Sequence, residues 1–265
     1  MKKRTISGIL ATLLTLVCLL TGCGNRTVIS YDTNATAATN ATIRVNQRTL
    51  PTYTIPQATV PTAGQKPITV SMNKVGNHGQ VDMTPIFNKD VFSDCSNPSD
   101  GGFDDQARHM GTRGVSDFSM NGVPFHFGSF ADGQNNAMFC NYDDIVFAKP
   151  FRCDSIQMIV SSKNGDYGLS FFVEYTDGTF TLNTIWSPDW CNKTAPDRAY
   201  TIPHAHLYDE QKNTWETNHE RYLFMRELDV NPNKLVKRIV IGEEAKAMRL
   251  HANVAIFAMT AVNVR

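Results

Sequence analysis

The stretch "YGLSFFVEYTDGTFTLNTIWS", residues 167–187, decides the fold class. In its first half, apolar residues alternate with small or polar ones, as expected when successive side chains point to opposite faces of a β-strand. Asp177 and Gly178 then form a pair typical of a tight hairpin turn. After the turn the alternation resumes and places Phe180 and Trp186 on one face, which we assign to the core. The stretch predicts an antiparallel hairpin.

Further strands are predicted along the rest of the chain, and helical periodicity is hard to find. The predicted strands cover 123–127, 137–147, 155–161, 222–230, 237–241 and 254–264. Two long polar loops are predicted, at 93–121 and 187–220. We therefore predict one all-β domain over 67–265, long enough for a sizeable core. An antiparallel jelly-roll β-sandwich is the expected architecture.

The N-terminus has the parts of a bacterial lipoprotein leader. Residues 2–4 are basic, residues 6–20 are apolar, and the following "LTGC" resembles a lipobox that ends at Cys23. We predict a signal peptide over 1–22, acylation of Cys23, and a protein held by lipid on the extracytoplasmic side, at the cell surface or the outer membrane. The alternative is an ordinary signal peptide in which the cysteine has no special role.

Residues 23–66 are predicted to be a disordered linker. Thr, Asn and Ala dominate this segment, three prolines punctuate its second half, and its few apolar residues show no period. Such a segment buries too little surface to offset the entropy lost on ordering. As a flexible coil it would span roughly 35–40 Å on average.

Charge and cysteine content narrow the range of partners. Without residues 1–22, 22 basic residues remain against 25 acidic ones, a net charge of −3, which argues against a nucleic-acid partner.

Four cysteines follow Cys23, at 95, 140, 153 and 191, without the close paired spacing of a zinc site. Outside the cell they could form two disulfides, and buried thiols are the alternative.

Seven stretches of the predicted domain point to a family. They are "VDMTPIFNKDVFSD" (81–94), "GGFDDQARHM" (101–110), "VPFHFG" (123–128), "FFVEYTDGT" (171–179), "SPDWC" (187–191), "LDVNPNKLVKRIVIG" (228–242) and "VAIFAMTAV" (254–262). Together they resemble the galactose-binding-like (discoidin-type) jelly rolls appended to secreted, fucosidase-like glycosidases. The resemblance implies a non-catalytic module that binds glycans through loops at one end. It also implies a structural calcium ion, for which Asp100, Asp104 and Asp105 are the densest acidic cluster; a solvated acidic loop is the alternative.

The segment 187–222 holds the candidate ligand-binding residues. Sugar rings pack their apolar face on aromatic side chains, and their hydroxyls hydrogen-bond to polar ones. Trp215 stands among polar neighbours, and Trp190, Tyr208, His206 and Arg221 lie in the same segment. The alternative for Trp215 is a lid over its own loop, and for Trp190 a plug at one end of the sandwich. A further candidate is His109, in the other long loop.

A metal site is the competing interpretation of the same segment. His204, His206 and Glu210 have the spacing of metal ligands in cupins. The glycines of the cupin pattern and its second motif are missing, and Pro203 disfavours a central strand. Three hypotheses thus remain: a carbohydrate-binding lipoprotein without catalysis, a protein-interaction module of the cell envelope, and a metal-dependent enzyme.

Overall fold

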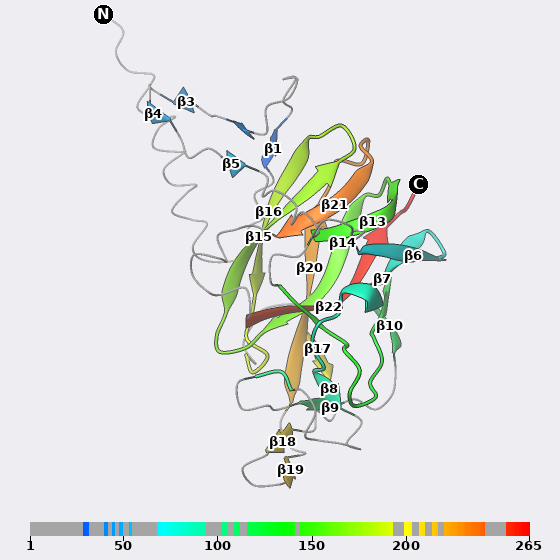
Figure 1. Ribbon diagram of the computed structural model, residues 1–265, viewed down its shortest axis with the longest axis vertical. Helices are drawn as coiled ribbons and strands as arrows, with labels where there is room; N and C mark the ends of the chain where they lie inside the picture. The colour runs from blue at the N-terminus through cyan, green and yellow to red at the C-terminus, as the bar shows by residue number, and fades with distance from the viewer. Residues whose placement is uncertain are drawn as a thin grey trace, which may run out of the picture.

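The computed structural model describes residues 68–92, 102–104, 109–111, 116–140, 144–192, 220–241 and 253–265 in full, and outside these ranges it describes Ser93 and eight short strands by their backbone (Figure 1). The regular structure in this part of the chain is β-strand apart from a single 3-10 turn, η1 (Thr84–Ile86). The prediction of an all-β protein is confirmed. No helix among the described residues has the length and apolar character needed to cross a membrane.

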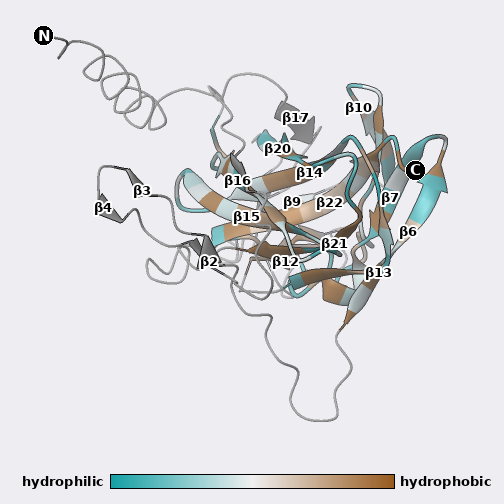
Figure 2. Ribbon diagram, turned by 90° about the horizontal axis from the view of Figure 1, so that it is seen from above, coloured by the Kyte–Doolittle hydropathy of each residue, from teal (hydrophilic) through white to brown (hydrophobic). Residues whose placement is uncertain are grey.

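Two mainly antiparallel sheets form the sandwich, and Figure 2 shows them from above as two layers. Sheet 1 contains, in spatial order, β16 (Phe180–Ser187), β15 (Tyr167–Tyr175), β21 (Val236–Ile241), β13 (Asp144–Phe151) and the start of β6 (Thr69–Val75). Sheet 2 contains β7 (His78–Asp82), β22 (Val254–Val262), β14 (Ser155–Ser162), β20 (Arg221–Asp229) and β17 (Ala199–Ile202). Strand β6 joins the sheets, because it pairs in parallel with β13 and then forms a hairpin with β7.

The main core lies between the two sheets. Alternate residues of β15 point inward, among them Leu169, Phe171 and Val173, and they meet Met158 and Ile256 of sheet 2 in one buried cluster. This arrangement is what the period-2 pattern of the hairpin predicts.

A third layer covers the outer face of sheet 2. It is built from β8 (Phe92–Ser93), β9 (Met110–Gly111), β10 (Asp117–Met120) and β11 (Val123–His126), whereas β12 (Met138–Phe139) pairs with β22 and belongs to sheet 2. Its apolar side chains, such as Phe92 and Phe125, pack against Phe257 and Leu223 in a second buried cluster. Sheet 2 is therefore buried on both faces, which explains why β22 is almost continuously apolar. The prediction of a polar loop over 93–121 is wrong where Phe103 and other buried residues fall within it.

Most predicted strands lie where the sequence placed them. Strands β11, β14, β20, β21 and β22 match the predicted ranges within a few residues, and the predicted hairpin 167–187 is β15 and β16. The single strand predicted over 137–147 is two strands, β12 and β13, with different partners. The hairpin β6–β7 had no counterpart among the predictions.

The position of Trp186 in β16 differs from the prediction. The turn forms as predicted, with Gly178 at φ +82°, and Phe180 is buried. Trp186 is 57% exposed, so its assignment to the core is wrong. Alternation identifies the face on which a side chain lies, but what covers that face depends on other parts of the chain.

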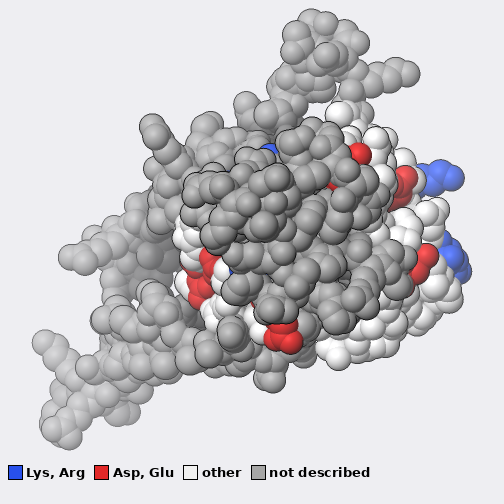
Figure 3. All heavy atoms as spheres, turned by 90° about the horizontal axis from the view of Figure 1, so that it is seen from below, with Lys and Arg blue, Asp and Glu red and all other residues white. Residues whose placement is uncertain are grey.

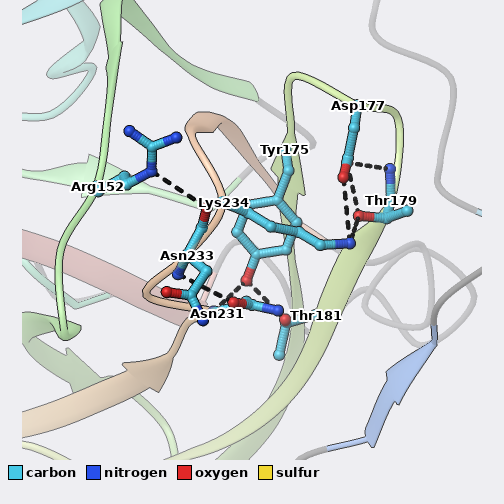
Figure 4. Close-up of polar contacts among 8 residues, drawn as sticks. All are labelled: Arg152, Tyr175, Asp177, Thr179, Thr181, Asn231, Asn233 and Lys234. Carbon is cyan, nitrogen blue, oxygen red and sulfur yellow. Dashed lines mark hydrogen bonds and ion pairs between the residues drawn. The ribbon is translucent and has the colours of Figure 1, made fainter.

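Tyr175 links the β15–β16 turn to the β20–β21 turn by hydrogen bonds at one end of the sandwich (Figure 4). Its buried hydroxyl lies 2.7 Å from Thr181 Oγ1 and accepts the backbone N–H of Asn231 at 2.6 Å. Burial raises the pKa of Tyr175. Next to it, Lys234 Nζ lies 3.1 Å from Asp177 Oδ2. These contacts close the end of the sandwich opposite the segment that carries the candidate ligand-binding residues.

The N-terminal predictions fall largely outside the described residues. Residues 1–22 and Cys23 lie outside them, as does most of 23–66. Five short strands lie within 23–66: β1 (Ile29–Tyr31), β2 (Asn40–Ala41), β3 (Arg44–Val45), β4 (Arg48–Thr49) and β5 (Tyr53–Thr54). Strand β1 pairs with β16 at the edge of sheet 1. The signal peptide, the lipid anchor and the linker remain predictions.

Among the described cysteines there is no disulfide. Cys140 and Cys153 are buried thiols, and Cys191 is an exposed thiol. Burial raises the pKa of Cys153 to about 12, which leaves this sulfur protonated at neutral pH. Cys95 lies outside the described residues.

Candidate functional site

Trp190 forms the base of the end of the sandwich opposite Tyr175, which we call the loop end. Its backbone N–H donates to the carbonyl of Ser162 at 2.8 Å, and its carbonyl accepts the N–H of Tyr222 at 2.9 Å. The indole is 1% exposed and meets the ring of Phe103 at 5.0 Å between centroids. Trp190 therefore ties strands β14 and β20 to the third layer, as the plug interpretation predicts. In this position it offers no exposed face to a sugar.

Arg221 lies over the same indole ring. Its guanidinium carbon lies 4.8 Å from the centre of the Trp190 ring, and the residue is 8% exposed. One guanidinium nitrogen donates to the carbonyl of Glu220 at 2.9 Å. A buried cation is costly unless a partner stabilises it, and the face of a tryptophan is a favourable partner. Arg221 and Trp190 thus act as one buried unit.

Two aspartates hold the turn that carries Trp190. Asp189 accepts the backbone N–H of Gly165 at 2.6 Å and that of Cys191 at 2.7 Å. The N–H of Asp189 in turn donates to Asp166 at 2.7 Å. Aspartate side chains commonly satisfy backbone donors in this way within turns. These two aspartates are not among the predicted site residues, although "NGD" (164–166) and "SPD" (187–189) are recognisable turn signals.

The hairpin of β18 (Leu207–Asp209) and β19 (Thr214–Glu216) extends the loop end. It follows β17 in the chain and precedes β20, and Figure 1 shows it beyond the end of the sandwich. Its register pairs Tyr208 with Trp215, so two predicted candidates occupy one position of the ladder. His206 lies outside the described residues.

His109 lies in the third layer and is completely buried. It directly precedes Met110, which belongs to the same apolar cluster as Trp190. The structure therefore gives His109 no surface that faces solvent.

The predicted metal ligands fall mostly outside the described residues. His204, Glu210, Asp100 and Asp105 all lie there, and Asp104 is 8% exposed. Within the part that the structure describes, no group of three or more His, Cys, Asp or Glu side chains is placed to hold a metal ion. The calcium site and the cupin-like site remain predictions.

The described charges seen from the loop end are mixed. Figure 3 shows described acidic groups at several places around the margin of this face, and described basic groups mainly along one side of it.

Comparison with known families identifies the domain. A family model described as the AziU2-like beta-sandwich domain matches residues 77–265. The chain belongs to this family. The match covers both sheets, the third layer and the loop end, and it begins within the hairpin β6–β7. No curated protein matches the chain. For this AziU2-like domain the β-sandwich is thus established, while the galactose-binding-like branch remains a resemblance.

Proposed function

We propose that this protein is a non-catalytic surface lipoprotein whose AziU2-like β-sandwich binds extracellular or cell-wall carbohydrate at the loop end. The proposal includes acylation of Cys23 and a location outside the cytoplasm, with membrane contact through the lipid only. Nucleic acid is not an expected partner, because the chain without its leader is slightly acidic.

The observation that supports this function best is the pairing of Tyr208 with Trp215 in the β18–β19 hairpin. Directly paired positions of an antiparallel ladder are about 5 Å apart, so the backbone register brings two aromatic positions together. Aromatic residues on loops held by a rigid sandwich are typical of binding sites. The buried Trp190–Arg221 unit provides the rigid base, since it is locked into β14 and β20.

The proposal is tested on a glycan array with the protein and its Trp215→Ala variant, with Trp215→Phe as the conservative control. Binding by the protein, a large loss in Trp215→Ala and partial retention in Trp215→Phe are expected, because a phenyl ring keeps part of the stacking surface. Equal binding by all three proteins would remove Trp215 from the site. An absence of binding to any glycan by the unaltered protein would overturn the function and favour a protein-interaction module.

The lipid anchor has its own test. The unaltered protein should incorporate labelled fatty acid, whereas a Cys23→Ala variant should not. Equal labelling of the two proteins, or no labelling of either, would contradict the anchor without affecting the binding proposal.

A further inference from the structure

Part of the outer face of sheet 1, which points away from the main core, is buried. The ladder register places two rows of outward residues across strands β16, β15, β21 and β13. The first row is Leu182, Phe172, Val240 and Asp144, and the second is Phe180, Glu174, Arg238 and Val146. Phe172, Phe180, Leu182 and Val240 form an apolar cluster of their own, and each is at most 8% exposed. Side chains that stand side by side on a sheet shield one another's flanks but not their tips, so these rows have a cover.

The charged residues of the two rows are buried as well. The side chains of Glu174 and Asp144 are each 9% exposed, and that of Arg238, which bridges them, is 14% exposed. On an open sheet face these groups would stay hydrated, because an ionised group loses a large hydration free energy when it leaves water. The cover therefore extends across the sheet from β16 to β13.

The fully described strands do not account for this cover. The main contacts of sheet 1 with other described elements are those with β14 and β20, across the main core, and with β1 at its edge. Strand β1 continues both rows, because Ile29 stands opposite Leu182 and Tyr31 opposite Phe180 (Figure 1). The next outward position of β16, Thr184, lies beyond this pairing and is exposed. On β16, burial of the outward side chains thus ends where the pairing with β1 ends.

The course of the chain also leads toward this face. Strand β1 lies at one edge of sheet 1, whereas β6, the next strand of the two main sheets along the chain, lies beside β13 at the opposite edge. Five strand spacings separate the two edges, about 24 Å. The inner face is filled by the main core, so residues 32–68 pass either over the outer face or around one end of the sandwich. The buried rows favour the outer face.

We propose that residues 29–66 form a strap that begins as β1 and crosses the outer face of sheet 1, which makes this face an intramolecular docking surface. The strap contains apolar residues suited to the cluster, among them Ile43, Val45, Leu50, Tyr53 and Ile55. Its many threonines and asparagines can hydrogen-bond at the margins of the cluster. Because β1 already pairs with β16, the rest of the strap is held next to the face at a high effective concentration. This arrangement differs from the disordered linker predicted over 23–66.

A docked strap shortens the distance over which a lipid anchor could hold the domain. Only residues 24–28 separate Cys23 from β1, and fully extended they reach about 20 Å. A free linker over 23–66 would instead span roughly 35–40 Å on average. This consequence, unlike the strap itself, rests on the proposed acylation of Cys23. With that anchor, the β16 edge of sheet 1 stays close to the membrane.

An engineered disulfide tests the docking in the full protein. In an antiparallel ladder, the Cβ atoms of directly opposed residues are about 4.5–5.5 Å apart, and diagonal neighbours are about 7–8 Å apart. Under mild oxidation, the Ile29→Cys/Leu182→Cys protein should therefore form an intramolecular disulfide, whereas the Ile29→Cys/Thr184→Cys control should not. Peptide mass spectrometry identifies the bond and distinguishes it from one to the exposed Cys191.

Thiol labelling tests whether the strap crosses the face. A Val240→Cys protein should react with a maleimide much more slowly than a Thr184→Cys protein, because Val240 is 2% exposed and Thr184 is exposed. Adding Ile29→Asp and Tyr31→Asp should release the strap and speed labelling of Val240→Cys roughly tenfold or more. Ile68→Asp is the matched control, since Ile68 is an apolar residue that is already 60% exposed, and it should leave the rate unchanged.

The outcomes separate the strap from the other proposals. Absence of the Ile29–Leu182 disulfide, or equal bonding in the Thr184 control, would overturn the docking, and this test does not require the Asp variants to fold. Disulfides between two chains, seen as a dimer on a non-reducing gel, would assign the strap to a second copy and overturn the intramolecular arrangement. Equally fast labelling of Val240→Cys and Thr184→Cys in the otherwise unaltered protein would overturn the crossing. A lack of fatty-acid labelling at Cys23 would remove the consequence for the membrane and leave the strap in place.

Discussion

Replacing Tyr175 by Phe should destabilise the protein without altering its core volume. The hydroxyl makes two short contacts, with Thr181 Oγ1 at 2.7 Å and with the N–H of Asn231 at 2.6 Å. Tyr175 and Thr181 are each 1% exposed, so water cannot easily replace the lost oxygen. Each buried hydrogen bond is worth about 1 kcal/mol, and a donor left without a partner costs more. We therefore expect a loss of about 2–3 kcal/mol in the free energy of unfolding.

Urea denaturation followed by fluorescence measures this loss, and thermal unfolding checks it. For a domain of this size, about 1 kcal/mol corresponds to roughly 2–4 °C, so the midpoint should fall by roughly 4–12 °C. Tyr167→Phe is the control in the same strand: the Tyr167 hydroxyl also makes two hydrogen bonds, at 2.9 Å to the carbonyl of Asn164 and at 3.1 Å from Asn253 Nδ2, but the residue is only partly buried, so its loss should be smaller. A loss below about 0.5 kcal/mol in Tyr175→Phe, or an equal loss in the two variants, would refute the assigned role of the hydroxyl.

Three further predictions concern charge and thiol chemistry. Arg238→Met should cost roughly 3–5 kcal/mol at neutral pH, because it removes the partner of the two carboxylates of Asp144 and Glu174, whose side chains are each 9% exposed. Burial already raises the pKa of Asp144, so this carboxylate should become protonated in the variant as the pH falls, and the cost of Arg238→Met should then decrease. Urea unfolding of both proteins across pH 5–8 would detect the decrease. The pKa of Asp177 is lowered, chiefly by the hydrogen bond of its carboxylate with Thr179. The ionised carboxylate should therefore stabilise the fold at neutral pH, and this stabilisation should be lost as the pH falls below the ordinary Asp pKa of 3.8. The Asp177→Asn variant should lack this loss of stability in acid. Cys153, with its pKa raised to about 12, should react with iodoacetamide only on unfolding, as followed by mass spectrometry.

Each of these predictions has a control. Lys237 also contacts Glu174, but its side chain is 51% exposed, so Lys237→Met should cost less than about 1 kcal/mol. Equal costs for Lys237→Met and Arg238→Met would show that burial of the pair is unimportant. A Thr179→Val variant should resemble Asp177→Asn in its acid profile. Cys191 is exposed and should be alkylated in the folded protein, and equal labelling of Cys153 would contradict its burial.

Some of the residues that the sequence groups as candidates lie close together in the structure. Tyr208 and Trp215 stand out in the sequence because they are aromatic residues in a polar stretch, and the register does pair them. Trp190 and Arg221 were grouped for the same compositional reason, yet in the structure their side chains pack against each other. Residue type shows that a side chain can bind, but only the surrounding atoms show whether its face is already occupied.

The sequence by itself determined the class of fold and the course of most strands. Alternation and the Asp177-Gly178 turn are local signals, so they can be recognised without knowing which distant segments pack against them. Only the tertiary structure decided what covers each face. The layer over sheet 2 makes "VAIFAMTAV" (254–262) buried on both sides, while Trp186, in step with the buried Phe180, is left in solvent. Burial depends on elements far apart in the chain, and a two-residue period carries no information about them.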